Sequence, residues 1–488
     1  MSRAAALALA LSAASGLALL SAACEPELGD VPATCPNGTC PEGYECIHGV
    51  CARPGTSIPI TVEATDFLRA NDLIVVPQEG SVLVLWETYA YSTEGQSIRA
   101  RRLFADGSVS EPMVLEDTWV AAEAGLEPFF DVLSVSDTSA LLALTSGTID
   151  DAPEPRLRVF HVSLPASGEE ASGVVTVPAW EDEVRMPTLG YGGVSRPHFV
   201  RRDDSRISLG YFQSRAIASD VPSEGGGGAA GGGGAGQGGG AEGGAGGGLP
   251  DAGVTLGELA VFELDAQGEV VVAPQPCGPD ETCCVASACT QARADRTLAV
   301  GVVGGYATES AMTWVLDDER PSVLVVPDAA PEPLEAPLPN LCVPVGVIPG
   351  SAGEEGLLVL VPSERTGEKL PTDPVEGPAM VQLRTLSGSE DLVELPIMHD
   401  SPRPATLLAS PESLLVATPG RSADAATLLV YRVDLSARAY DLLAEIPRLS
   451  SQTVGVVRIV AAAGKLFVVW LDEGDETVTI RAAILEGL

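Results

Sequence analysis

The chain has 488 residues, of which 67 are acidic and 28 are basic, and its formal net charge is −39 at pH 7. A field of this sign repels nucleic acid and anionic lipid headgroups, so we expect no nucleic-acid partner. Hydrophobic residues make up 45% of the chain, which excludes a wholly disordered protein, and the 5% of aromatic residues argues against an extensive sugar-stacking surface.

The first 23 residues predict a signal peptide for export. Arg3 is the lone positive charge, residues 4–20 form an apolar run, and small residues precede Cys24. This segment ends in LLSAAC and resembles a bacterial lipobox, in which cleavage before the cysteine accompanies attachment of diacylglycerol to its thiol. The resemblance implies a lipoprotein that is lipidated on Cys24 and anchored outside the cytoplasm, in the outer membrane or on the cell surface.

Two other interpretations of this segment stay open. Ser21-x-Ala23 also suits ordinary signal peptidase, which gives a freely secreted protein, and an uncleaved anchor is the other, although the run is short and alanine-rich for a membrane span. The ten cysteines of the chain can pair evenly, whereas lipidation of Cys24 leaves one odd thiol.

A short tether, residues 24–34, leads to a predicted disulfide module at residues 35–52. Its sequence CPNGTCPEGYECIHGVC is too small to bury a core, so we expect two disulfides among its four cysteines. A zinc site would need closer pairs such as C-x-x-C, which are absent. The segment resembles small cysteine-rich modules that follow the lipidated cysteine in some bacterial lipoproteins. The predicted disulfide cysteines are Cys35, Cys40, Cys46 and Cys51.

From Ser57 onward, apolar runs of strand length alternate with Gly, Pro, Asp and Ser turns, and no helical period is sustained. A pair of strands recurs seven times, mostly at intervals of about 45 to 66 residues. The first members of these pairs are Val82–Trp86, Ala140–Leu144, Ile207–Tyr211, Ala311–Val315, Gly356–Leu360, Ser413–Ala417 and Lys465–Trp470.

This period is typical of propeller blades, so residues 57–488 predict an all-β fold, a seven-bladed β-propeller. Six or eight blades, and tandem β-sandwiches, are the alternatives. In the first copy we expect strands at 72–76, 82–86, 97–103 and 109–115. The last copy offers only three strands, and we expect residues 57–63, SIPITVE, to supply its fourth and close the ring.

One insertion interrupts the repeats at residues 225–248, where 17 of 24 residues are glycine. With almost no side chains to bury, such a segment cannot recover the entropy of ordering, so it predicts a flexible loop. Gly231, Gly233 and Gly236 match G-x-G-x-x-G, but no predicted strand precedes the segment and no helix follows it. We therefore expect no nucleotide site there.

In a propeller, the connections from second to third strands and from fourth strands to the next blade share one face, and the candidate site residues fall there. Five further cysteines suggest two disulfides with one thiol left over, with a metal or redox site as the alternative. These are Cys277, Cys283, Cys284, Cys289 and Cys342. Tyr89, Tyr91, Trp119 and Trp180 are candidates for an aromatic binding patch, whereas we expect Trp86 and Trp470 to pack between blades.

Acidic loops recur on the same predicted face, and Asp472 and Asp475 are candidate binding residues in one of them. Dense carboxylates can hold Ca²⁺, but no loop matches the spaced D-x-[DN]-x-[DN]-G motif. Solvated charge is therefore the default, and we predict no metal ion and no cofactor.

No catalytic motif is present. The four histidines are scattered, and neither H-E-x-x-H nor G-x-S-x-G occurs, which favours binding over catalysis. The sequence predicts a membrane-tethered binding or scaffold lipoprotein that presents one loop-rich face to a protein or polysaccharide. The alternative is an extracytoplasmic polysaccharide hydrolase or lyase that uses carboxylates at the propeller channel, and a minor one is a subunit of a larger envelope complex.

Overall fold

The structure is a computed structural model of the chain, and it is all-β in the parts it describes. The described residues are 39–41, 45–47, 50–52, 59–65, 68–89, 96–119, 129–146, 156–166, 174–183, 197–201, 207–216, 255–272, 284–285, 288–289, 292–293, 297–303, 311–316, 323–325, 332–333, 343–349, 355–362, 379–385, 388–397, 404–421, 426–447, 453–473 and 478–486. Within them, no helix is long and apolar enough to cross a membrane.

The described strands form seven sheets of four or five strands and two two-stranded sheets. The first sheet contains β4 (Leu68–Pro77), β5 (Ser81–Tyr89), β6 (Gln96–Phe104) and β7 (Met113–Trp119). The second contains β8 (Phe129–Ser136), β9 (Ser139–Ser146), β10 (Arg156–Ser163) and β11 (Val175–Glu183). The third contains β12 (His198–Arg201), β13 (Ile207–Ala216), β14 (Thr255–Leu264) and β15 (Val270–Val272), with β18 (Ala292–Arg293) also paired to β14.

The remaining large sheets follow in chain order. The fourth contains β19 (Thr297–Val303), β20 (Ala311–Leu316), β21 (Val323–Val325) and β22 (Glu332–Pro333). The fifth contains β23 (Val343–Pro349), β24 (Glu355–Pro362), β25 (Ala379–Thr385) and β26 (Gly388–Leu395). The sixth contains β27 (Ala405–Ser410), β28 (Ser413–Arg421), β29 (Ala426–Asp434) and β30 (Ala439–Pro447). The seventh contains β31 (Thr453–Ala462), β32 (Lys465–Glu473), β33 (Val478–Glu486) and β3 (Ile60–Thr65).

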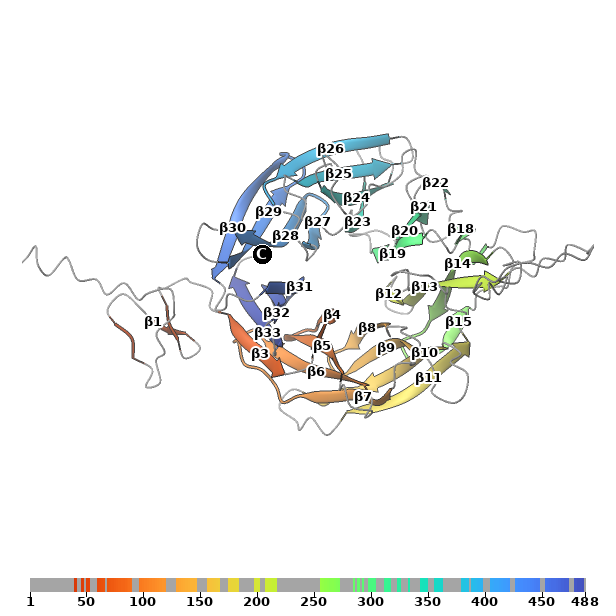
Figure 1. Cartoon of the computed structure of the whole chain (residues 1–488), viewed down its shortest axis with the longest axis horizontal. Helices are drawn as coiled ribbons and strands as arrows, with labels where there is room; N and C mark the ends of the chain where they lie inside the picture. The colour runs from red at the N-terminus through yellow and green to blue at the C-terminus, as the bar shows by residue number, and fades with distance from the viewer. Residues whose placement is uncertain are drawn as a thin grey trace, which may run out of the picture.

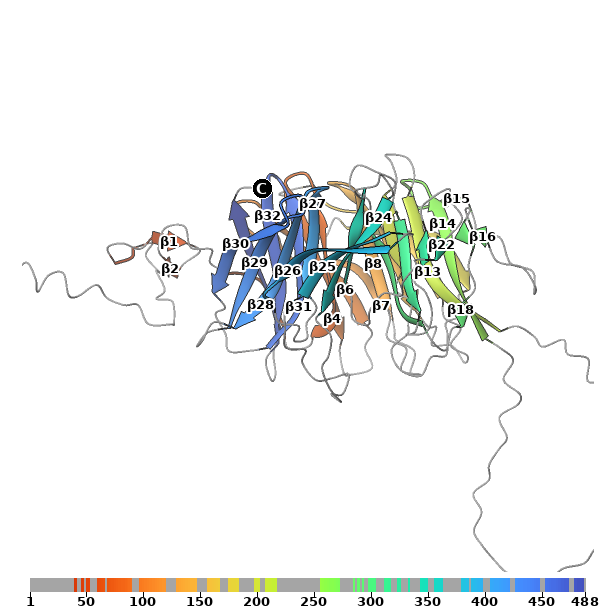
Figure 2. The same ribbon diagram turned by 90° about the horizontal axis from the view of Figure 1, so that it is seen from above.

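The sheets stand around a common centre, and the first strand of each lies nearest to it (Figure 1). In the view turned by 90°, the sheets lie next to one another with their strands running roughly upright (Figure 2). The first strands neighbour one another in chain order: β4, β8, β12, β19, β23, β27 and β31, with β31 beside β4 again. The all-β prediction is confirmed, and the number of propeller blades stays a prediction.

The seventh sheet joins the two ends of this ring. Its outer strand β3 pairs antiparallel with β33, with Ile60 opposite Ala482, Thr61 opposite Arg481 and Thr65 opposite Val478. The predicted pairing of the N-terminal strand with the last one is therefore confirmed, although β3 begins at Ile60, and residues 57–58 lie outside the described part of the chain.

Two predicted strand starts in the first sheet are wrong. The first strand is predicted from residue 72, but β4 begins at Leu68. The fourth strand is predicted from Val109, but β7 begins at Met113, and Val109 makes only an isolated bridge to Leu103. Pro112 lies between them and has no N–H to donate to a ladder, so regular pairing starts after it.

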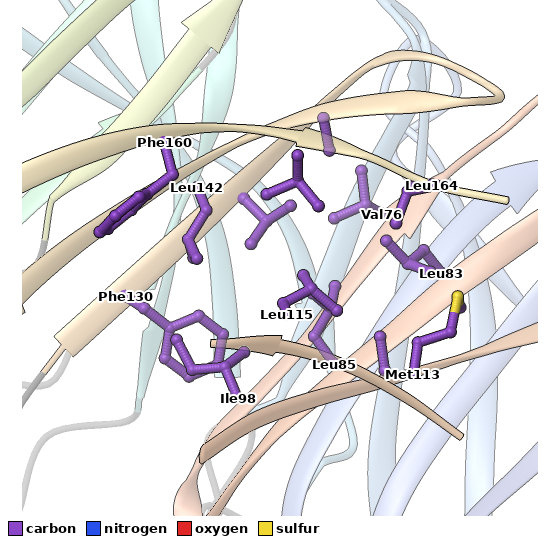
Figure 3. Close-up of a cluster of buried hydrophobic side chains, with 14 of the residues drawn as sticks. Val76, Leu83, Leu85, Ile98, Met113, Leu115, Phe130, Leu142, Phe160 and Leu164 are labelled. Carbon is purple, nitrogen blue, oxygen red and sulfur yellow. The ribbon is translucent and has the colours of Figure 1, made fainter. Parts of the chain in front are cut away.

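Strand β5 shows why the sheets stack. Leu83 and Leu85 lie in the hydrophobic cluster shared with the second sheet, which Figure 3 shows with Phe130, Leu142 and Phe160. The alternate residues of β5 lie in the cluster shared with the seventh sheet: Val82, Val84 and Trp86. Both faces of the strand are buried, so its sequence is a continuous apolar run. At about 25 cal/mol per Å² of apolar area, such clusters supply most of the force that holds neighbouring sheets together.

Polar contacts reinforce the seam between the first and seventh sheets. Arg101 Nε on β6 donates to Glu63 Oε2 on β3 at 2.7 Å, and Lys465 Nζ on β32 donates to the carbonyl of Ala105 at 3.0 Å. Both contacts therefore join the first sheet of the chain to the last one.

A glycine turn seats the third sheet against the second. Gly268 has φ +83°, and a Cβ there would lie 3.0 Å from Leu141 Cδ2 and 3.1 Å from Ala179 Cβ. Only glycine meets both the backbone conformation and the close approach without strain.

The small module ahead of the ring contains the two-stranded sheet of β1 (Glu45–Ile47) and β2 (Val50–Ala52). Cys40 and Cys51 form a disulfide, and Cys46 is disulfide-bonded too, so the predicted disulfide character of this segment is confirmed for these three cysteines. Cys24 and Cys35 lie outside the described residues, as do the Gly-rich segment 225–248 and Cys277, Cys283 and Cys342.

Candidate functional site

The ring has two faces, which we name by their connections. The turn face carries the connections between the first and second and between the third and fourth strands of each sheet. The loop face carries the connections between second and third strands and from one sheet to the next, and most of these lie outside the described residues. The sequence placed its candidate binding residues on the loop face.

Of the predicted aromatic patch, the structure describes three backbone positions. Gln96 on β6 pairs with Tyr89 on one side and with Trp119 on the other, so both aromatic residues lie at the loop-face end of the first sheet. Trp180 lies on β11, the outer strand of the second sheet, where it pairs with Val159 of β10. Tyr91 lies outside the described residues, so the patch stays a prediction.

The two strand-end tryptophans pack as predicted. Trp86 lies in the cluster between the first and seventh sheets, and Trp470 lies in the cluster between the sixth and seventh sheets. Both are buried, so neither takes part in a surface patch.

Asp472 is fully buried in an ion pair. Its Oδ2 accepts from Arg481 Nε at 2.7 Å, and its Oδ1 accepts from Trp470 Nε1 at 3.1 Å. Arg481, which is 16% exposed, also donates to Thr61 Oγ1 of the closing strand at 3.0 Å. A ligand that binds Asp472 would have to compete with these partners. The predicted binding roles of Asp472 and of Asp475, which lies outside the described residues, stay predictions.

We expect Asp472→Asn to lower the free energy of unfolding by about 1–2 kcal/mol, because the amide keeps an acceptor but leaves the mostly buried Arg481 without its counter-charge. Urea denaturation measures this loss. The exposed Asp441→Asn, on β30 of the sixth sheet, is the matched control and should change stability by less than about 0.5 kcal/mol. Unchanged stability in Asp472→Asn would contradict a structural role for the ion pair.

A hollow of about 640 Å³ opens on the turn face beside the centre of the ring. It lies between the turn from β4 to β5, the turn from β8 to β9 and the end of β12, so three consecutive sheets contribute to it. Its lining comprises Val76, Pro77, Gln78, Glu79, Leu133, Ser134, Val135, Ser136, Asp137, Thr138 and Arg201. Sequence reasoning missed this site, since no motif joins these positions.

Two carboxylates stand at the rim of the hollow. Glu79 and Asp137 are exposed, and the backbone N–H of Glu79 donates to Asp137 Oδ1 at 2.7 Å. This contact ties the two turns together, and it fixes the Asp137 carboxylate through one of its two oxygens.

A buried arginine outside the lining holds two of the turns that form the hollow. Arg102 on β6 is 4% exposed, and its guanidinium donates to Gln78 Oε1 at 3.1 Å, to the carbonyl of Asp137 at 2.5 Å and to the carbonyl of Pro165. Burial lowers the pKa of the Arg102 guanidinium, and the nearby Asp137 carboxylate opposes that shift. One side chain therefore joins the β4–β5 turn of the first sheet to two carbonyls of the second sheet.

The opposite rim carries Arg201, whose exposed guanidinium donates to the carbonyls of Ser134 and Val135. The backbone N–H of Phe199 donates to Asp131 Oδ2 at 2.7 Å, so β12 is fixed to β8. The hollow thus has a rigid frame with carboxylate, guanidinium and hydroxyl groups at its rim and aliphatic carbon from Val76 and Val135 in its wall.

This arrangement suits a polar, uncharged ligand with many hydroxyl groups. Carboxylates accept from hydroxyls, the guanidinium donates to them, and the valines offer apolar contact to C–H groups. Among the described residues, no group of three or more His, Cys, Asp or Glu is placed to hold a metal ion.

No family model matches the chain. No curated protein matches it either. Several solved structures are similar at low identity. The polysaccharide lyase Uly1 is 11% identical, with 94% of this chain and 98% of that one covered and a TM-score of 0.45. A Fusarium graminearum α-L-arabinofuranosidase, Arb93A, is 9% identical, with 88% and 97% covered and a TM-score of 0.38.

A Trypanosoma rangeli sialidase in complex with sialic acid is 10% identical, with 88% of this chain covered and a TM-score of 0.37. This chain spans only 57% of that sialidase. All three TM-scores lie below 0.5, so the likeness carries no conclusion about fold or activity.

Proposed function

We propose that the chain is a seven-bladed β-propeller that acts on polysaccharide outside the cytoplasm, held to a membrane by a lipid on Cys24. The cyclic order of the first strands and the pairing of β3 with β33 support the blade count. Tandem sandwiches would not place the first strand of the last sheet beside that of the first.

The polar hollow carries the assignment of the ligand. Glu79, Asp137 and Arg201 surround it at the ends of inner strands, where a polymer can cross the mouth of the channel. The net charge of −39 disfavours polyanions, so neutral or amino-sugar polysaccharides fit better than uronates. The similar structures include a polysaccharide lyase and an α-L-arabinofuranosidase, but the proposal rests on the hollow.

Hydrolysis is the chemistry that this hollow favours. Most glycoside hydrolases use two carboxylic groups, one to protonate the leaving oxygen and one as base or nucleophile, and Glu79 and Asp137 are the two carboxylic side chains of the lining. A lyase eliminates beside a uronate carboxylate, and the charge of the whole chain repels such a polymer.

The test uses the purified full chain and a panel of neutral, amino-sugar and uronate polysaccharides. Released reducing ends report hydrolysis, ultraviolet absorbance of unsaturated uronates reports elimination, and retarded migration in polysaccharide gels reports binding. We expect reducing ends from a neutral or amino-sugar polymer, and a loss of about 10²-fold or more in rate in Glu79→Gln or Asp137→Asn. The Asn variant keeps an acceptor for the Glu79 N–H.

Glu412→Gln is the matched control. Glu412 is an exposed residue in the turn from β27 to β28, on the same face of the sixth sheet and away from the hollow. Equal losses in Glu79→Gln and Glu412→Gln, or neither product nor retardation with any polymer, would contradict the proposal.

The second candidate is a non-enzymatic binding or scaffold lipoprotein that uses the loop face. The positions of Tyr89 and Trp119 on either side of Gln96, at the loop-face end of the first sheet, favour it. Under this function, retardation occurs without products, persists in the hollow variants and is lost when residues 225–248 and 277–289 are deleted.

A further inference from the structure

The chain makes an excursion from the third sheet between β15 and β18. Both strands pair with β14: β15 opposite Glu263 and Leu264, and β18 opposite Leu256 and Gly257. The excursion therefore leaves and returns to the same strand. Between these anchors lies the second two-stranded sheet, formed by β16 (Cys284–Val285) and β17 (Ala288–Cys289).

The register of this hairpin sets two of its cysteines opposite each other. Val285 pairs with Ala288 next to the connection, and Cys284 pairs with Cys289 one position further out. In a two-residue hairpin, the pair beside the turn exchanges hydrogen bonds, so the next pair is of the non-hydrogen-bonded kind. The Cα atoms of such pairs lie about 4.5 Å apart, within the range of about 4.4–6.8 Å that a disulfide spans.

We propose that Cys284 and Cys289 form a cross-strand disulfide. Each thiol loses a proton, and the two sulfurs together pass two electrons to a disulfide oxidant of the exported compartment, which is reduced to a dithiol as the new S–S bond forms. The bond rests on the proposed export of the chain but not on its action on polysaccharide.

This pairing resolves the ambiguity of the adjacent cysteines Cys283 and Cys284. A vicinal bond between them is excluded, because Cys284 is already engaged, and Cys283 is left to pair with Cys277 or Cys342 or to remain a thiol. The bond closes only a short loop, so it fixes the hairpin locally, while β15 and β18 fix the ends of the excursion on β14.

Thiol counting on the exported full chain tests the assignment. The protein is unfolded in urea without reductant, at a pH low enough to stop exchange, and labelled with a maleimide. Relative to the unsubstituted chain, we expect Cys289→Ser to gain one reactive thiol and Cys284→Ser/Cys289→Ser to gain none. Relative to Cys283→Ser, we expect Cys283→Ser/Cys289→Ser to gain one. A gain of two in Cys284→Ser/Cys289→Ser, or no gain in Cys283→Ser/Cys289→Ser relative to Cys283→Ser, would overturn the pairing.

Mass spectrometry of the unsubstituted chain gives a second readout that needs no variant. In a peptide that spans both cysteines, we expect no backbone fragments between Cys284 and Cys289 until the peptide is reduced. Such fragments in the unreduced peptide would also overturn the assignment. A chain that carries this bond but leaves every polysaccharide intact would contradict the proposed function alone.

Discussion

Arg102→Ala is expected to lower the free energy of unfolding by about 3–4 kcal/mol. The side chain is 4% exposed and donates to Gln78 and to two main-chain carbonyls, those of Asp137 and Pro165. Alanine removes these donors and leaves the acceptors in a site that water reaches poorly, which costs the desolvation of each of them. Urea denaturation followed by fluorescence measures the loss.

Two further variants separate the possible causes. Arg102→Lys keeps the charge but lacks the planar fork, so it should retain only part of the stability. Arg99→Ala on the same strand removes an exposed arginine and should cost less than about 0.5 kcal/mol. If Arg102→Ala were no worse than Arg99→Ala, the buried network would not hold the first and second sheets together.

Val62→Asp is expected to cost more than about 4 kcal/mol and to release the closing strand. Val62 is 2% exposed and lies in the cluster between the first and seventh sheets. An aspartate there must carry its charge into an apolar site or withdraw β3 from β33. Hydrogen exchange of the β33 amides reports the withdrawal directly, and urea denaturation reports the loss of stability.

Ala64→Asp is the matched control, because Ala64 lies exposed on the same strand and receives the same charge. It should change stability by about 0.5 kcal/mol or less. Should Val62→Asp fail to fold, Val62→Ala gives a milder test, with an expected loss of about 2 kcal/mol. Protected β33 amides in Val62→Asp would contradict a role for β3 in closing the ring.

The strands could be read from the sequence where their residues are buried on both faces. The runs at Val82–Trp86 and Lys465–Trp470 lie within β5 and β32, because a strand packed between two sheets must be apolar throughout. The closing strand was predictable for another reason, the missing fourth strand of the last copy, since Thr61 and Ala64 on β3 are exposed. The start of β7 was missed because hydropathy alone joins Val109 to the apolar residues after Pro112, whereas the proline delays regular pairing until Met113.

The hollow could not be predicted. Its residues come from three separate sheets, and Glu79 and Asp137 look like ordinary turn residues in the sequence. What brings them together is Arg102, an arginine in a strand that the sequence gives no reason to consider buried. The cysteines and aromatic residues of the repeats favour the loop face instead, but burial removes Trp86 and Trp470 from any surface there.

The position of β3 has a mechanical consequence. The polypeptide ahead of Ile60 enters the ring at the seventh sheet. A pull on that segment therefore loads the β3–β33 hydrogen bonds before the hydrogen bonds of any other sheet. Of the side-chain contacts of β3, that of Thr61 with Arg481 is loaded first and that of Glu63 with Arg101 follows. Tension on a tether at this end would therefore detach β3 from β33 first. The ring would open at the seventh sheet while the other six sheets remained intact.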